Sequence, residues 1–91
     1  MFRQVVEPNK GMIFPQPRPQ PASFWMKNTL IPLDIIFIRD DGTIARIEAN
    51  TVPLSEDPVP SGEPIVLVLE LAGGRAAELG IAEGDKVEWP R

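Results

Sequence analysis

Eleven prolines are spread through this chain of 91 residues, and with seven glycines they account for 18 of its positions. Proline has no backbone N–H donor and disfavours a helical conformation at the residue before it. A chain with this much proline cannot form long helices, so we predict short strands joined by stiff loops. The densest stretch, "PQPRPQP" (Pro15–Pro21), predicts an extended connector.

The overall composition is that of one small globular domain. The chain is 43% hydrophobic and 24% charged, with 9 basic and 13 acidic residues and a net charge of −4. Nucleic-acid binders normally carry a basic surface, so this balance disfavours nucleic acid as a partner. The apolar stretches are too short to cross a bilayer. We therefore predict a single domain over residues 1–91, without membrane insertion.

The chain has neither cysteine nor histidine. Their absence excludes disulfides, thiolate chemistry and the usual zinc sites, and leaves only metals that accept oxygen ligands. The acidic segment "SEDP" (Ser55–Pro58) lacks the alternating carboxylate spacing of a calcium loop. We predict no cofactor and no metal.

Two segments have apolar residues on both faces of an extended chain. They are "LDIIFI" (Leu33–Ile38) and "IVLVLEL" (Ile65–Leu71), and such strands belong in the middle of a barrel or sandwich. Asp41-Gly42 follows the first of them and predicts a hairpin with a type I′ turn. The segment "TIARIEA" is then the returning strand.

The remaining segments predict shorter elements. We expect strands at "GMIF", "SFWMKN" and 85–89, a proline-rich loop over 50–64 with a short bridge near 52–54, and one helix near 74–79 that ends at Gly80. The predicted fold class is α+β, mainly β: a compact, barrel-like sheet, antiparallel or mixed, with one short helix.

Three ionisable residues, Lys27, Asp34 and Glu70, interrupt strands that otherwise look buried. An unpaired buried charge is costly, so each of them should have a partner or lie near water. The structural interpretation is an ion pair of Lys27 with Asp34 or Glu70, together with hydrogen bonds between Asp34 and loop amides across the Pro32 break, which would fix strand register. It predicts that Lys27 lies within ion-pair distance of at least one of the two carboxylates.

The functional interpretation is a small polar pocket. Its members would be Lys27, Asn28, Thr29, Asp34 and Glu70, with Phe24 and Trp25 as its wall. Two carboxylates and a lysine could serve as acid, base and electrostatic clamp if burial separated their pKa values. Catalysis is the weaker form of this interpretation, and no residue is assigned as catalytic.

The motif "SFWMKNTLIPLDIIFI", followed in order by "DDGTI", "VLEL", "GRAAELGI" and "GDKV", resembles the domain of unknown function 192 family of small bacterial and archaeal proteins. The resemblance spans about Gly11 to Val87 and implies a compact, mainly β fold. It brings no established activity. The family's signature residues fall on Trp25, Met26, Lys27, Asn28, Thr29, Pro32, Asp34 and Glu70.

The same resemblance implies a periplasmic or envelope location, because family members are often exported, although this sequence shows no signal peptide. Family members usually have a further strand and a short helical segment before the position of "MFRQ". We therefore expect that the N-terminal part of the family domain is missing. A chain that starts there would leave a sheet edge unpaired, which favours a homodimer.

Together these observations predict a non-catalytic accessory module of the bacterial envelope that binds a small molecule or a protein. Two alternatives stay open. One is a small hydrolase or lyase that uses the carboxylates. The other is a DNA-binding regulator of the swapped-hairpin kind, in which the cassette "LGIAEGDKV" also occurs.

Overall fold

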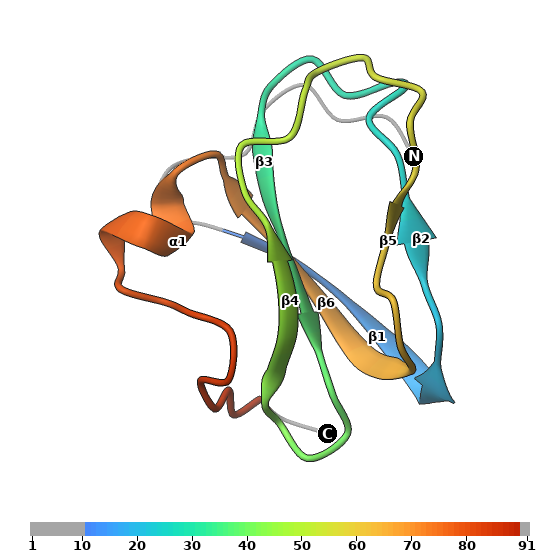
Figure 1. Cartoon of the computed structure of the whole chain (residues 1–91), viewed down its shortest axis with the longest axis vertical. Helices are drawn as coiled ribbons and strands as arrows, with labels where there is room; N and C mark the ends of the chain where they lie inside the picture. Colours follow the sequence, from blue (N-terminus) through green and yellow to red (C-terminus); the bar gives the residue numbers. More distant parts are fainter. Residues whose placement is uncertain (1–10, 90–91) are drawn as a thin grey trace.

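The computed structural model describes residues 11–89 (Figure 1). Four strands form an antiparallel sheet in the order β1-β6-β3-β4. Their bounds are β1 Gly11–Gln20, β3 Leu33–Ile38, β4 Ile44–Glu48 and β6 Ile65–Ala72. A two-stranded antiparallel sheet pairs β2 (Ser23–Phe24) with β5 (Val59–Pro60), and α1 spans Arg75–Glu78. The prediction of a mainly β domain with one short helix is confirmed, and the larger sheet is open rather than closed into a barrel.

The two strands that are apolar on both faces lie in the middle of the larger sheet. β3 and β6 pair with each other, and every residue of β3 is buried. The prediction for these two segments is therefore confirmed. One face of the sheet packs in a first core cluster and the other face in a second.

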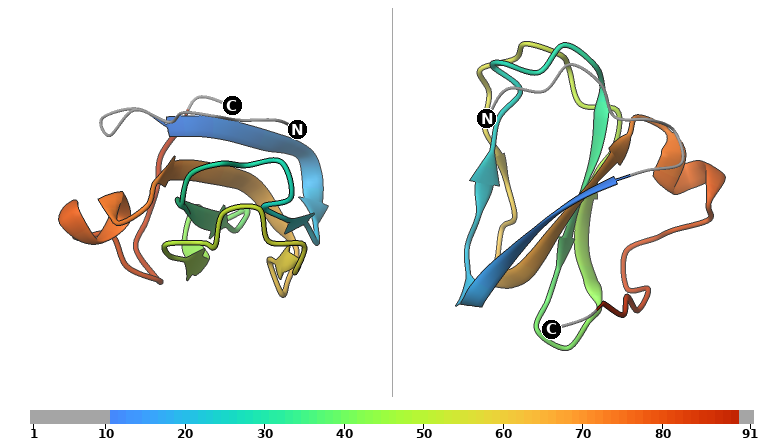
Figure 2. Two further views of the ribbon diagram at one scale, coloured as in Figure 1. Left: turned by 90° about the horizontal axis from the view of Figure 1, so that it is seen from above. Right: turned by 180° about the vertical axis from the view of Figure 1, so that it is seen from behind.

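The first core cluster lies between the larger sheet and the β2–β5 pair, which forms a second layer (Figures 1 and 2). The Phe24 ring lies 5.7 Å from that of Phe14 and 6.3 Å from that of Phe37, measured between ring centroids. Met26 and Val59 are buried in the same cluster. The segment around β2 is thus held to the sheet by side-chain packing rather than by a shared ladder.

The second core cluster lies under α1 and the segment that follows it. Ala76 of α1 is buried there, with Ile81, Val87 and Trp89 packed against the cluster. The helix ends as the sequence predicts, because Gly80 has a φ of 70°. The Gly80 N–H donates to the Ala77 carbonyl and the Ile81 N–H to the Ala76 carbonyl, which is the Schellman arrangement.

The β3–β4 hairpin is confirmed, but the predicted type I′ turn is wrong. Gly42 has a φ of 89°, whereas Asp41 has no positive φ. The Gly42 N–H donates to the Arg39 carbonyl, and the Arg39 N–H donates to the Thr43 carbonyl. This is a three-residue loop with glycine in the left-handed position. Hydrogen bonds from the Thr43 side chain and amide lower the pKa of the Asp41 carboxyl.

Four predicted segments differ in the structure. The tract at Pro15–Pro21 is not a connector, because most of it belongs to β1. Pairing of β1 with β6 breaks between Pro15 and Gln20, where two further prolines lack N–H donors. The predicted strand "SFWMKN" is reduced to Ser23–Phe24. The expected bridge near 52–54 lies instead at Val59–Pro60, and the strand at 85–89 is only one isolated bridge, Thr43 with Lys86.

Two glycines with positive φ should respond differently to alanine. A Cβ on Gly80 would meet nothing within 4 Å, whereas one on Gly42 would lie 2.9 Å from the Val87 carbonyl oxygen. We expect Gly80→Ala to lower the free energy of unfolding by roughly 1–2 kcal/mol, from backbone strain alone. Gly42→Ala should lower the free energy of unfolding by clearly more, because the added Cβ would also crowd the Val87 carbonyl oxygen. Urea unfolding of both variants checks this, and equal losses would contradict the close approach of residue 87 to the hairpin.

Candidate functional site

The Asp34 carboxylate lies near the start of β3 and is fully buried. Its Oδ1 accepts hydrogen bonds from the N–H groups of Asn50 (2.9 Å) and Gly74 (3.0 Å), and its Oδ2 accepts one from that of Ala76 (2.8 Å). Hydrogen bonds to an ionised group are stronger than neutral ones and compensate the loss of water. Three backbone donors therefore account for a charge that looked out of place in an apolar strand.

This carboxylate also serves as the cap of α1. The N-cap residue of the helix is Gly74, which has no side chain to accept a hydrogen bond from the first turn. Asp34 accepts from the N–H groups of Gly74 and Ala76, across 40 and 42 residues of sequence. Its third bond, from Asn50, fixes the chain that leaves β4. The role of Asp34 is therefore to join β3, α1 and the loop between β4 and β5, residues 49–58.

Glu70 is almost fully buried in β6, but it faces away from Asp34. In the β3–β6 ladder, Asp34 is opposite Leu71 and Ile35 is opposite Glu70. Residues opposite each other share a face of the sheet, and neighbours along a strand alternate. The two carboxylates therefore lie on opposite faces, so they cannot act together on one substrate atom.

Lys27 does not form the predicted ion pair. The ion pairs among residues 11–89 are Arg39–Glu63, Arg46–Glu48 and Arg75–Glu78, and none of them joins Lys27 to a carboxylate. The expectation was wrong because Lys27 follows a buried residue, Met26, and points outward on an exposed turn. Its Nζ lies 5.2 Å from the centroid of the Trp25 ring, a cation–π contact.

The other members of the predicted polar site are also dispersed. Asn28 is exposed in the turn that the Thr29 N–H closes onto the Met26 carbonyl. Thr29 is buried, and its Oγ1 has no hydrogen-bond partner in the described part of the chain. Of the predicted wall, Phe24 belongs to the core. Phe24 and Trp25 nevertheless line one hollow of about 170 Å³, together with Ser23 and Pro58.

Two loops at one end of the molecule carry most of its large exposed apolar side chains. Six large ones are exposed among residues 11–89, and four of these lie on two loops: Trp25 (51%), Leu30 (48%), Val52 (69%) and Leu54 (54%). The Leu54 N–H donates to the Thr29 carbonyl and the Met26 N–H to the Ser55 carbonyl. These bonds hold the loops side by side at the end away from the β3–β4 turn (Figure 1). We call these four side chains the loop tip.

Leu54 adopts a backbone conformation that leucine rarely takes. Its φ is 64°, and the Ser55 N–H donates to the Val52 carbonyl across Pro53 and Leu54. A turn with proline second and a positive φ third is of type II, where glycine or asparagine is normally preferred. The chain therefore carries local strain at a residue whose side chain is exposed, as functional loops often do.

A cavity of about 260 Å³ adjoins the loop tip. Met26 and Val59 contribute apolar surface, and the rest of the lining is Glu48–Val52, Ser55, Asp57 and Pro58. Sequence reasoning missed this cavity because its other lining residues are 22 positions or more from Met26 in the chain. The signal that could have been used is the pair Val52 and Leu54, two apolar residues within a proline-rich polar loop.

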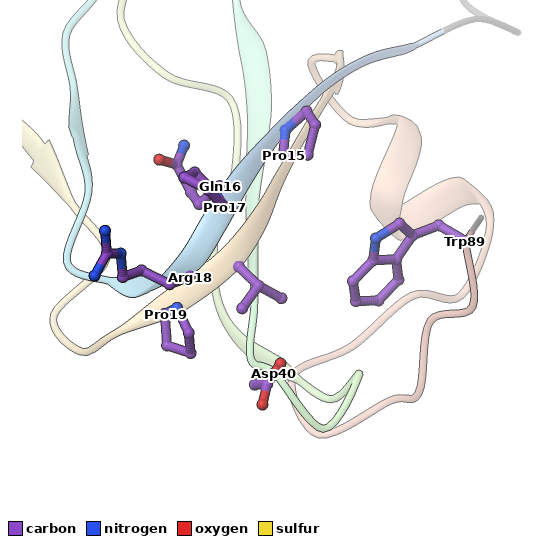
Figure 3. Close-up of a pocket in the computed structure, with 8 residues that line it drawn as sticks. Pro15, Gln16, Pro17, Arg18, Pro19, Asp40 and Trp89 are labelled. Atoms are coloured by element: carbon purple, nitrogen blue, oxygen red, sulfur yellow. The ribbon is translucent and has the colours of Figure 1, made fainter. Parts of the chain in front are cut away.

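A second hollow lies beside β1, on another part of the surface. It measures about 380 Å³, and Figure 3 shows Trp89 across it from Pro15, with Asp40 at one end. Most of its lining residues belong to β1, and three of them are prolines, so the tract that looked like a connector lines this groove. The groove carries one arginine and one aspartate and therefore has no clear preference for charge.

The described residues were compared with the requirements of a metal site and of a membrane-spanning helix. Within residues 11–89, no cluster of three or more potential ligands is placed to hold a metal ion. The same part of the chain contains no helix long and apolar enough to cross a bilayer.

The family model for domain of unknown function 192, described as "Uncharacterized ACR", matches residues 1–89. The chain belongs to this family. The match covers nearly the whole chain and agrees with the resemblance carried by the "SFWMKNTLIPLDIIFI" motif. The domain of unknown function 192 family supplies a fold and no activity, and no curated protein matches the chain.

Two crystal structures resemble this domain of unknown function 192 member closely. One is a "putative transcription regulator" from Sinorhizobium meliloti 1021, with 45% sequence identity and a TM-score of 0.89. The other is a protein of unknown function from Novosphingobium aromaticivorans DSM 12444, with 53% identity and a TM-score of 0.91. The matches cover 97% and 98% of this chain, respectively. They cover 68% of the length of the first crystallised chain and 64% of the second.

The placement of Lys27 predicts that its charge adds little to stability. We expect Lys27→Met to change the free energy of unfolding by less than about 0.5 kcal/mol, as for an ordinary surface position.

Thr51→Val should instead lower the free energy of unfolding by about 1–3 kcal/mol, because the buried Thr51 hydroxyl bonds to the Leu33 amide and carbonyl. Chemical denaturation of both variants checks this. An equal loss in Lys27→Met would show that the lysine has a structural partner after all.

Proposed function

We propose that this protein is a non-catalytic accessory module of the bacterial envelope that binds a protein partner at the loop tip. The observation that carries the proposal is the exposure of Trp25, Leu30, Val52 and Leu54 on two loops held together by backbone hydrogen bonds. Large exposed apolar residues that gather at one place are typical of interaction surfaces, and tryptophan is enriched at the centre of such surfaces.

The alternation of buried and exposed side chains within the "FWMKN" motif supports this function. Phe24 and Met26 pack in the core, whereas Trp25, Lys27 and Asn28 between and after them are exposed. Lys27 has the aromatic ring of Trp25 as its contact rather than a carboxylate. The outward side chains therefore have little role in holding the fold and are free to contact a partner.

The strain at Leu54 supports the same surface. A leucine at a φ of 64° is less stable there than asparagine or glycine. Residues of this kind are commonly retained at the expense of stability because they serve function. In this case the strained turn presents an apolar side chain to solvent.

The enzyme alternative receives no support from the carboxylates that suggested it. Asp34 accepts three backbone N–H groups, and Glu70 lies on the other face of the sheet. A DNA-binding regulator is favoured by one observation, the similarity to a protein described as a regulator. The net charge of −4 weighs against it, and salt-dependent binding of duplex DNA would be its signature.

We do not propose a homodimer through a sheet edge. β1 and β4 are the edge strands of the described sheet. β1 carries Pro15, Pro17 and Pro19, and prolines block edge-to-edge pairing. On β4, the Ile47 N–H donates to the Glu83 carboxylate. Both edges are therefore partly protected against a second strand.

The proposal predicts position-specific cross-linking in the native host. A photo-reactive amino acid at Leu30 should cross-link to one discrete protein, because this side chain would be covered by the partner. The matched control is Leu79, which is 52% exposed but lies next to α1, remote from the tip. If positions 30 and 79 gave the same adducts, the proposal would be contradicted. It would also be contradicted if position 30 gave no adduct in either the envelope fraction or the cytosol.

Leu54→Asn provides the companion variant. Asparagine tolerates positive φ, so the variant should fold and gain stability of about 1 kcal/mol. We expect it to lose the cross-link formed from position 30, since it removes an apolar contact. A stable Leu54→Asn protein that retains the full cross-link would place the partner elsewhere.

A further inference from the structure

We propose that the 260 Å³ cavity beside the loop tip is a specificity pocket for a cationic side chain, arginine or lysine, of the protein that docks there. The inference rests on the proposed function and deepens it by naming the chemistry of the partner. It is carried by the charge of the lining, by the fixed position of the surrounding loop and by the size of the cavity.

The charged residues that line the cavity are both acidic. They are Glu48 and Asp57, and no lysine or arginine is among the lining residues. The Asp57 amide donates to Ser55 Oγ, while the Asp57 carboxylate has no hydrogen bond or ion pair with any residue in 11–89. This carboxylate is therefore available to a ligand.

Glu48 is partly neutralised by a neighbour outside the lining. Arg46 Nη2 lies 2.7 Å from Glu48 Oε1, and Arg46 also donates to the Pro60 carbonyl. The cavity edge thus has two carboxylates and one nearby guanidinium, and the exposed Glu56 stands in the chain between the lining residues Ser55 and Asp57. The charge around the cavity is negative on balance, which favours a cation and disfavours an anion.

The chain that forms the cavity is held in place before any ligand arrives. The backbone N–H of Asn50 donates a hydrogen bond to the Asp34 carboxylate. Thr51 bonds to Leu33 through both its backbone N–H and its hydroxyl. The Thr51 hydroxyl also approaches Met26 Sδ at 3.2 Å. A preformed pocket binds with less loss of conformational freedom than one that must be ordered.

The size and surface of the cavity fit one side chain rather than a whole ligand. Pockets for drug-sized molecules typically measure about 300–1,000 Å³, and this cavity is smaller. Met26, Val52 and Val59 offer apolar surface for a methylene stem, while the carboxylates suit its charged head. Arginine and lysine are the side chains that combine these two parts.

The cavity is continuous with the loop tip. Val52 belongs to both, and Ser55, which lines the cavity, accepts the hydrogen bond that ties it to the Trp25–Thr29 turn. A partner that covers the tip with apolar groups could therefore insert one basic side chain next to them. A partner segment with a basic residue beside apolar ones is the occupant that this surface favours.

The test uses two small probes that differ mainly in charge. N-acetyl-arginine amide is titrated into the ¹⁵N-labelled full chain, and N-acetyl-citrulline amide serves as its neutral isostere. We expect saturable shifts of the Asn50, Thr51 and Asp57 amides with the arginine probe, weakened by added salt, and no saturation with citrulline. Equal binding of both probes, or no saturation with arginine up to its solubility limit, would overturn the inference.

Matched variants locate the site. Asp57→Asn and Glu48→Gln should each raise the dissociation constant of the arginine probe roughly three- to fivefold, as expected for partly exposed ion pairs. Glu56→Gln, beside the cavity but not lining it, should change it less. If Glu56→Gln has an effect as large as that of Asp57→Asn, binding is diffuse attraction to an acidic surface and the inference fails.

The outcome can be separated from that of the proposed function. Cross-linking at Leu30 without selectivity for arginine would keep the loop tip as the docking surface and reject the specificity pocket. Arginine binding that depends on Asp57, without a cross-link, would reject a protein partner at the tip and leave the cavity as a site that selects a guanidinium group. The Leu54→Asn variant should bind the arginine probe like the parent, because Leu54 does not line the cavity.

Discussion

The hydrogen bonds of the Asp34 carboxylate determine how the loops and the helix are arranged around the sheet. A carboxylate in an apolar strand is stable only if donors replace its water, and three backbone N–H groups from two distant segments do so. One side chain thereby fixes the start of α1 and the path of the chain after β4. A domain with so small a core has few other ways to hold its irregular segments.

This arrangement separates the residues that hold the fold from the exposed residues at which we propose that a partner binds. The loop between β4 and β5 is fixed on its inner side. Asn50 bonds to Asp34, and Thr51 bonds to Leu33 and Met26. The outer side of the same segment then presents Leu54 in a strained turn and the carboxylate of Asp57 at a cavity. The hydrogen bonds beneath the exposed loop would give the proposed binding surface a defined shape.

The sequence was most informative where one local pattern determines the structure. Leu33–Ile38 and Ile65–Leu71 are apolar on both faces and form the central strands, and Gly80 ends the helix as predicted. Loop amides were expected as partners of Asp34, but across the Pro32 break. The actual donors are the N–H groups of Asn50, Gly74 and Ala76, which lie up to 42 residues away and carry no side-chain signal. The Lys27 ion pair was wrong because strand alternation continues past β2 and turns the lysine outward. The loop tip depends on contacts between distant loops, which no local pattern reveals.

The most direct test of this account is the stability of Asp34→Asn. The asparagine amide would face the Ala76 N–H, so a donor would meet a donor and the charge would be lost. We predict a loss of about 2–4 kcal/mol in the free energy of unfolding. Asp85→Asn, at an exposed carboxylate that accepts only the Ala82 amide, should lose far less. A loss in Asp34→Asn no larger than that in Asp85→Asn would contradict the structural role of Asp34.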